Sequence, residues 1–107
     1  MAEYIQISTT TASRQEAEKI ADALLGQRLA ACVWISPVSS RYRWQGNIEK
    51  DNEFLCVIKS RKRLFGAVEE VICKLHSYDV PEILAVPVVA IASGYEDWLN
   101  RELDNGG

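Results

Sequence analysis

The sequence predicts an α+β fold in which two strand–helix–strand units share one antiparallel sheet. Three features predict it: two amphipathic helical patterns, apolar extended segments flanking each of them, and a very long central hairpin. The hairpin runs from Ala30 to Lys59 and is expected to turn at Gln45-Gly46-Asn47, because Gly46 and Asn47 tolerate positive φ. Valine, isoleucine, tyrosine, tryptophan and cysteine dominate both of its runs, which is typical of strands.

The hairpin is unusually long, since a common strand has about five or six residues and each run here is about twice that. Its outer half, Ser36–Trp44 opposite Asn47–Glu53, mixes polar and aromatic side chains. Either this half packs on its own domain, or it projects as an arm whose Tyr42 and Trp44 contact another copy. We favour the arm, because so small a domain has little other surface to bury those rings. Pro37 marks an edge, a bulge or a bend.

The segment before the hairpin predicts a strand and a helix. Tyr4–Thr11 alternates between polar and apolar residues, as a strand does. Ser13 and Glu16 form a capping box that starts the helix, and Gly26 can end it. Four residues at helical spacing give this helix one apolar stripe: Ala17, Ile20, Ala21 and Leu24.

A second helix is expected after the hairpin, capped by Ser60. Its apolar face consists of Leu64, Val68, Val71, Ile72 and Leu75. Arg61, Lys62 and Arg63 place positive charge at the positive end of the helix dipole, where acids are preferred. Either this basic turn receives an anion or the acids of a neighbouring arm, or it is simply solvated.

The C-terminal part predicts one more strand and a short helix. Ile83–Ile91 is almost continuously apolar apart from Pro87, so it is expected to be buried on both faces for much of its length. Ser93 and Glu96 suggest another capping box. The helix that follows would present an apolar face of Tyr95, Trp98 and Leu99.

The resulting order is βαββαβ plus a terminal helix, which is the ferredoxin-like α+β sandwich. With 107 residues, the chain is expected to form a single domain over residues 1–107. One layer of helices covers only one face of a sheet, so the other face needs a partner. Self-association is the simplest way to cover it.

Composition narrows the classes of partner and compartment. The net charge of −3 argues against nucleic acid, and no apolar run is long enough to cross a bilayer. The N-terminus lacks the basic and apolar segments of a signal peptide. The three cysteines are widely spaced, which fits free thiols in a reducing cytoplasm.

Cys32, His76 and Glu82 are the candidate metal ligands. A thiolate such as that of Cys32 suits copper(I) or zinc, although a cysteine inside an apolar strand is often an inert hydrophobe. His76 is the only histidine, and imidazole is the commonest protein metal ligand. Glu82 can join the metal or orient the ring. Alternatively, His76 closes the C-terminus of the second helix.

A second set of residues suggests a cleft for a small anion: Trp44, Lys59, Arg61 and Tyr78. Aromatic residues are more often core or interface anchors, and Tyr42, Trp44 and Trp98 are predicted to be interface anchors. No phosphate-binding glycine loop, nucleophile elbow or H-E-x-x-H pattern is present in the sequence. We therefore expect no enzymatic activity.

Several motifs follow one another along the chain: Leu29–Val33, Pro37–Gly46, Glu53, Lys59, His76-Ser77-Tyr78, Pro81-Glu82 and Gly94–Leu99. Together they resemble the CutA family of divalent-cation tolerance proteins over nearly the whole chain. The chain departs from the usual family pattern at Trp34, where asparagine is common, and at Ser77, where proline is common.

This resemblance implies a compact homotrimer with a fold like that of PII signalling proteins. It also implies an association with copper or other divalent cations, and no established reaction. Two hypotheses result. The first is a cytoplasmic, homotrimeric metal-tolerance protein. The second is a PII-like sensor or scaffold whose inter-subunit clefts bind a small anionic ligand.

Overall fold

The computed structural model describes residues 3–104. Its elements confirm the predicted order and are, along the chain, β1 (Tyr4–Thr11), α1 (Arg14–Gly26), β2 (Cys32–Trp44), β3 (Asn47–Arg61), a 3₁₀ turn (Lys62–Leu64), α2 (Phe65–Leu75), β4 (Leu84–Pro87) and α3 (Ser93–Glu102). The strands form one sheet in the order β2-β3-β1-β4, and all three pairings are antiparallel. This is the ferredoxin-like arrangement.

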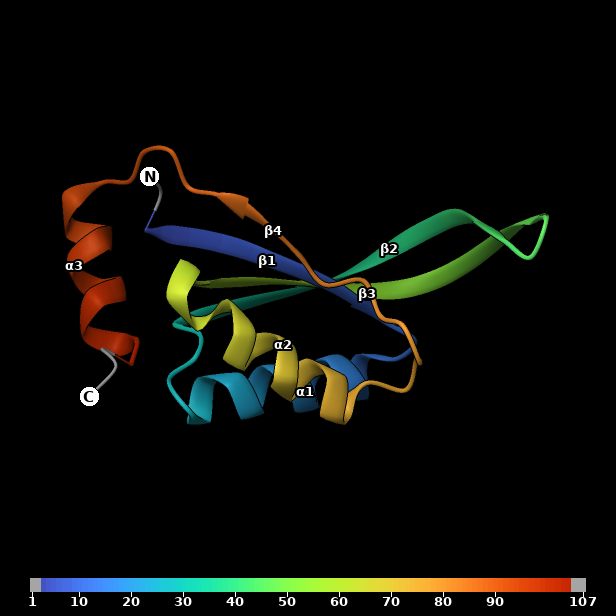
Figure 1. The fold of residues 1–107 in the computed structure, drawn as a ribbon, viewed down its shortest axis with the longest axis horizontal. Helices are drawn as coiled ribbons and strands as arrows, with labels where there is room; N and C mark the ends of the chain where they lie inside the picture. The colour runs from blue at the N-terminus through green and yellow to red at the C-terminus, as the bar shows by residue number, and fades with distance from the viewer. Residues whose placement is uncertain (1–2, 105–107) are drawn as a thin grey trace.

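The helices are placed asymmetrically around this sheet. Figure 1 shows α1 and α2 together on one face, α3 at one end, and the paired β2 and β3 projecting from the other end. The core lies between the sheet and the α1–α2 layer. Ile7 of β1 pairs with Ile58 of β3, and both are 0% exposed. Ile20 of α1 and Ile72 of α2 are equally buried, so the two predicted helical stripes both face the core.

The arm is confirmed, and its length comes from unequal strands. β1 pairs with β3 only from Phe54 to Arg61, whereas β2 follows β3 out to the pair Trp44 and Asn47. The radius of gyration is 14.5 Å, compared with about 13 Å for a compact chain of this length. Pro37 lies opposite Phe54 in an unbroken register on the edge strand β2, so it occupies an edge and causes no bulge.

The tip of the arm turns one residue earlier than predicted. Gln45 and Gly46 have φ values of 50° and 82°, and Asn47 already belongs to β3. A two-residue hairpin turn with positive φ at both positions has the twist that fits antiparallel strands. Gln45 therefore takes the strained position that the sequence had suggested for Asn47.

One of the three predicted helix caps is confirmed. Ser13 caps α1, because the Glu16 amide donates to the Ser13 hydroxyl at 3.2 Å. The predicted Ser60 cap is wrong, since Ser60 lies within β3 and its hydroxyl donates to the Leu29 carbonyl at 2.7 Å. The strand pairing with β1 continues to Arg61 and keeps this segment extended, so the helix starts later.

The C-terminal predictions also needed correction. The residue that precedes α3 is Ala92, with no side-chain cap, so the predicted capping box at Ser93 is wrong. The strand expected over Ile83–Ile91 is reduced to Leu84–Pro87, and all four of its residues are exposed. β4 is an edge strand that pairs only with β1. Nothing in the described chain covers it on both faces.

Candidate functional site

The two faces of the arm carry opposite charges. Side chains alternate across a strand, so the register places Ser40 and Tyr42 on the same face as Asp51 and Glu49. The opposite face carries the basic residues Arg41, Arg43 and Lys50. The arm therefore offers an acidic surface and a basic surface to whatever lies beside it.

A tyrosine and a carboxylate are paired on the acidic face of the arm. The Tyr42 hydroxyl donates a hydrogen bond to the Asp51 carboxylate. This bond, together with partial desolvation and the negative charge of Asp51, raises the pKa of Tyr42 to about 12. The hydroxyl therefore remains a neutral donor well above physiological pH.

A second tyrosine joins the connector between α2 and β4 to the base of the arm. The Tyr78 hydroxyl donates to the Glu53 carboxylate at 2.8 Å. Glu53 is only 7% exposed, so a buried carboxylate receives a hydrogen bond from a segment 25 residues away. Burial, followed by the hydrogen bond to Glu53, raises the pKa of Tyr78.

His76 lies next to the hydrogen bond between Tyr78 and Glu53, and both of its ring nitrogens are hydrogen-bonded. Its Nε2 lies 2.7 Å from the Thr10 carbonyl, and its Nδ1 accepts the Tyr78 amide at 3.1 Å. A carbonyl only accepts, so Nε2 carries the proton and the ring fits as the neutral tautomer. His76 also ends α2, where its amide donates to the Ile72 carbonyl at 2.9 Å. Binding a metal at either nitrogen would displace a hydrogen bond.

The three predicted metal ligands lie apart within one chain. Cys32, which is half-buried, starts β2 opposite Lys59, and Lys59 in turn pairs with Gln6 of β1. His76 contacts Thr10, which lies four residues beyond Gln6 along β1, or about 13 Å away from it. Across residues 3–104, no three histidine, cysteine, aspartate or glutamate side chains gather as a metal would require.

Glu82 lies on the connector near the middle of β1. Its side chain is exposed, and its Oε2 accepts the Ser8 hydroxyl at 3.3 Å. This carboxylate is therefore available to solvent, in contrast with the buried carboxylate of Glu53.

The four predicted cleft residues also occupy separate places. Trp44 is 59% exposed at the tip of the arm, and Lys59 lies near the opposite end of the sheet. Arg61 is buried and forms an ion pair with Glu3. Tyr78 is hydrogen-bonded to Glu53 at the base of the arm. A single chain does not bring them to one cleft.

The three predicted interface residues differ in their surroundings. Tyr42 and Trp44 are 41% and 59% exposed on the arm. Trp98 instead packs against the core of its own chain, and its ring lies 5.5 Å from that of Tyr95.

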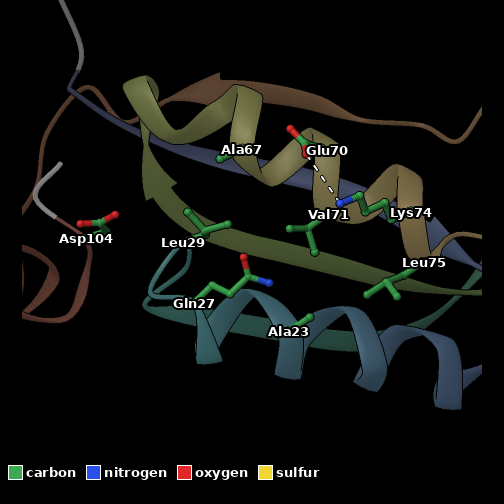
Figure 2. A pocket seen from close by; sticks show the side chains of 9 residues that line it. All are labelled: Ala23, Gln27, Leu29, Ala67, Glu70, Val71, Lys74, Leu75 and Asp104. Carbon is green, nitrogen blue, oxygen red and sulfur yellow. Dashed lines mark ion pairs between the residues drawn. The ribbon is translucent and has the colours of Figure 1, made fainter. Parts of the chain in front are cut away.

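A groove on the outer side of the helix layer was not predicted. It lies between α1 and α2 and has a volume of about 430 Å³. Figure 2 shows Leu29, Val71 and Leu75 along it, with the exposed ion pair of Lys74 and Glu70, 3.8 Å apart, on the α2 side. Sequence patterns assign Val71 and Leu75 to a helix but do not show how closely that helix approaches α1.

Comparison with known proteins identifies the family. The family model described as "CutA1 divalent ion tolerance protein" matches residues 5–102. This chain belongs to that family. The Divalent-cation tolerance protein CutA of Archaeoglobus fulgidus is 38% identical over 98 residues, covering 92% of this chain and 96% of the relative. That of Thermus thermophilus is 44% identical over 93 residues, covering 86% and 90%.

Plant members of the CutA family are longer. Protein CutA, chloroplastic, of Arabidopsis thaliana is 35% identical over 102 residues, which are 94% of this chain but only 56% of the plant protein.

Among solved structures, the Archaeoglobus fulgidus CutA has a TM-score of 0.92 at 37% identity, covering 94% of this chain and 99% of that one. CutA1 from Oryza sativa has a TM-score of 0.94 at 32% identity, covering 98% and 97%.

These structural matches confirm the predicted fold and family. Among residues 3–104, no helix has the length and hydrophobicity that crossing a bilayer would require.

Proposed function

We propose that this CutA-family chain serves divalent-cation tolerance as a homotrimer that binds copper or another divalent ion. The observation that carries this proposal is the family match over residues 5–102. Relatives that cover nearly the same length are named divalent-cation tolerance proteins. The metal, the trimer and the residues involved are parts of the proposal.

Two surfaces support self-association. Helices cover one face of the sheet (Figure 1), while the other face carries Trp34, which is 58% exposed. The arm adds Tyr42, Trp44 and Ile48, which are 41%, 59% and 63% exposed. Exposed aromatic and aliphatic side chains of this kind are typical of interface anchors. Three copies would cover both surfaces in a closed, symmetric assembly.

We place the metal between copies of the chain. One chain does not gather Cys32, His76 and Glu82, and both nitrogens of His76 are occupied. Cys32 begins the edge strand β2 and Glu82 is exposed, so each can approach a ligand from a neighbouring copy. The soft thiolate would favour copper(I), and the carboxylate would favour a harder divalent ion.

Calorimetric titration of the reduced protein with copper(I), copper(II) and zinc tests the metal proposal. We expect saturable binding that weakens in Cys32→Ser and in Glu82→Gln but not in the control Cys73→Ser, whose thiol is exposed on α2. Unchanged binding in both Cys32→Ser and Glu82→Gln would remove these ligands from the proposal. Sedimentation of a well-folded single chain at micromolar concentration would refute the trimer.

We propose that the protein acts in the cytoplasm without catalysing a reaction, and that its partners are neither nucleic acids nor membranes. The free thiols Cys32, Cys56 and Cys73 support a reducing compartment, and the net charge of −3 disfavours nucleic acid. The Archaeoglobus fulgidus relative is described as periplasmic. Cell fractionation with an antibody to the native chain distinguishes the two compartments.

A PII-like sensor of small anions is the second candidate. Lys59 favours it, because this half-buried cation forms no ion pair within the described chain. Inter-subunit clefts would have to bring Lys59 together with Trp44, Arg61 or Tyr78 of another copy. A thermal-shift screen of nucleotides and carboxylates tests this candidate. Stabilisation that is lost in Trp44→Ala supports the cleft, and stabilisation that persists in this variant contradicts it.

A further inference from the structure

The imidazole of His76 is closed to other partners by its hydrogen bonds. Its Nε2 donates to the Thr10 carbonyl at 2.7 Å, and its Nδ1 accepts the Tyr78 amide at 3.1 Å. A neutral imidazole has one protonated nitrogen and one nitrogen with a lone pair, so Nδ1 is the atom at which a metal ion or an electrophile would bind. The Tyr78 amide therefore masks the reactive position of the ring.

Ser77, the residue between His76 and Tyr78, is held by α1. The Ser77 amide donates to the Glu16 carboxylate at 2.8 Å, and the Ser77 hydroxyl donates to the other oxygen of this carboxylate at 3.3 Å. The amide bond is the stronger of the two, because it is shorter and its acceptor is charged. These two bonds, the Glu16–Ser77 clamp, join the connector after α2 to the first turn of α1.

The clamp lies between two other attachments of the same connector. Tyr78 is fixed at its hydroxyl by the Glu53 carboxylate at 2.8 Å, and its ring packs beside that of His76, with centroids 4.7 Å apart. The clamp holds Ser77 at both its backbone and its side chain. Because the Tyr78 amide belongs to the peptide group that follows Ser77, fixing Ser77 keeps this amide directed at Nδ1.

Glu16 has a second partner in the cap of its own helix. The Ala12 amide donates to the Glu16 carboxylate at 3.4 Å, which completes the capping box with Ser13. This bond is long, whereas the bond from the Ser77 amide is 2.8 Å. The carboxylate is therefore bonded mainly to the connector, and a test must separate the clamp from the cap.

We propose that Glu16 is a positioning residue that keeps His76 closed. Through Ser77 it holds the Tyr78 amide on Nδ1, and the ring becomes available as a ligand only when the clamp opens. The consequence for metal binding rests on the proposed function, because the clamp withholds the only histidine of the chain from a metal ion. The clamp itself consists of contacts within one chain and requires neither a metal nor a free surface.

Diethyl pyrocarbonate, which acylates a free imidazole nitrogen, is the probe that tests this proposal. His76 is the only histidine, so the ultraviolet absorbance of the acylated ring reports on this residue alone. In the metal-free full-length chain at neutral pH, we expect Glu16→Ala to accelerate the reaction at least about fivefold, because loss of the clamp favours local opening of the connector.

Two further variants separate the hydrogen bond from the charge. Glu16→Gln removes the charge but keeps an oxygen that can accept the Ser77 amide, so its rate should stay within about twofold of the natural rate. Glu18→Ala removes an exposed glutamate of the same helix and should leave the rate unchanged.

Nitrogen-15 spectra of the His76 ring add a readout that a simple loss of stability would not move. We expect a single tautomer, protonated at Nε2, in the natural chain and in Glu16→Gln. We expect a mixture of the two tautomers in Glu16→Ala, because Nδ1 is then no longer held by the Tyr78 amide.

Ser77→Pro separates the clamp from the helix cap. Proline has no amide hydrogen, and the extended backbone of His76, with φ of −80° and ψ of 139°, suits a residue that precedes proline. This variant lacks the clamp while Glu16 keeps its contact with Ala12. In the Ser77→Pro chain, Glu16→Ala should therefore change the rate by less than about twofold.

Three results would overturn the proposal. The first is an unchanged rate or an unchanged tautomer in Glu16→Ala. The second is Glu16→Gln reacting as fast as Glu16→Ala, which would assign the effect to charge. The third is an effect of Glu16→Ala that is equally large in the natural and the Ser77→Pro chains, which would assign it to the cap. None of these measurements involves a metal, so the clamp and the metal proposal can fail separately.

Discussion

The hydroxyl of Tyr78 donates a 2.8 Å hydrogen bond to the carboxylate of Glu53. Glu53 is 7% exposed, and it lies at the point where the three-stranded part of the sheet gives way to the two-stranded arm. The bond therefore links the connector after α2 with the base of the arm. This bond contributes to folding stability because the carboxylate is buried, and a buried acceptor without a donor lowers the free energy of unfolding.

Removing this hydroxyl should destabilise the protein. We expect Tyr78→Phe to lower the free energy of unfolding by about 1–3 kcal/mol, because the Glu53 carboxylate loses a donor while remaining buried. Urea denaturation at a fixed protein concentration measures the change. Tyr95→Phe is the matched control, since Tyr95 is 42% exposed and should change stability little. Equal effects of the two substitutions would contradict this role of Glu53.

The pair of Tyr42 and Asp51 should be visible in an alkaline titration. The hydrogen bond to Asp51 raises the pKa of Tyr42 from 10.0 to about 12. The folded state favours the protonated phenol, so this contribution to stability is present below pH 10 and is lost as the pH rises through about 12. The difference in tyrosinate absorbance between the natural chain and Tyr42→Phe should show this high midpoint.

Replacing the carboxylate identifies the cause of that shift. Asp51→Asn removes the charge that accepts the Tyr42 hydrogen bond, so the pKa of Tyr42 should fall toward 10.0. Glu49→Gln is the control, because Glu49 makes the smallest contribution to the shift. A midpoint that moves as far in Glu49→Gln as in Asp51→Asn would show that general negative charge, and not the hydrogen bond, dominates.

The three thiols should react at very different rates. Cys73 is exposed, Cys32 is half-buried and Cys56 is 0% exposed. Burial raises the pKa of Cys56 to about 11, which leaves almost none of the reactive thiolate at neutral pH. We expect alkylation to modify Cys73 first, Cys32 more slowly and Cys56 only in denaturant. Mass spectrometry of the digested protein measures the order, and rapid labelling of native Cys56 would contradict it.

The turn at the tip of the arm should control the stability of the arm alone. Gly46 has a φ of +82° and open space around it, so Gly46→Ala adds backbone strain of about 1 kcal/mol without a clash. We expect amide hydrogen exchange to accelerate about fivefold in the outer arm and to stay unchanged in β1.

Gly26→Ala is the matched control for this substitution. Gly26 is the last residue of α1, and it also has open space around it without a positive φ. The added methyl group there should be neutral or slightly stabilising. Faster exchange throughout the sheet in Gly46→Ala would show instead that the turn supports the whole fold.

The sequence by itself determined the order of elements and the existence of the arm. Alternation defined β1, and the spacing of Ile20, Leu24, Val68 and Ile72 placed the core on both helices, because local patterns of burial repeat with the period of the element. Local chemistry also located the cap at Ser13, whose partner Glu16 lies only three residues away.

Only the tertiary structure decided where strands end and which side chains meet. Serine is a common N-cap residue, but pairing of β3 with β1 keeps Ser60 in an extended strand. Tyr78 and Glu53 are 25 residues apart, and Tyr4 and Asn100 are 96 apart. Contacts across such separations depend on how the sheet and helices pack, and no local pattern encodes them. For the same reason, sequence reasoning could assign Val71 and Leu75 to a helix but could not predict the groove between α1 and α2.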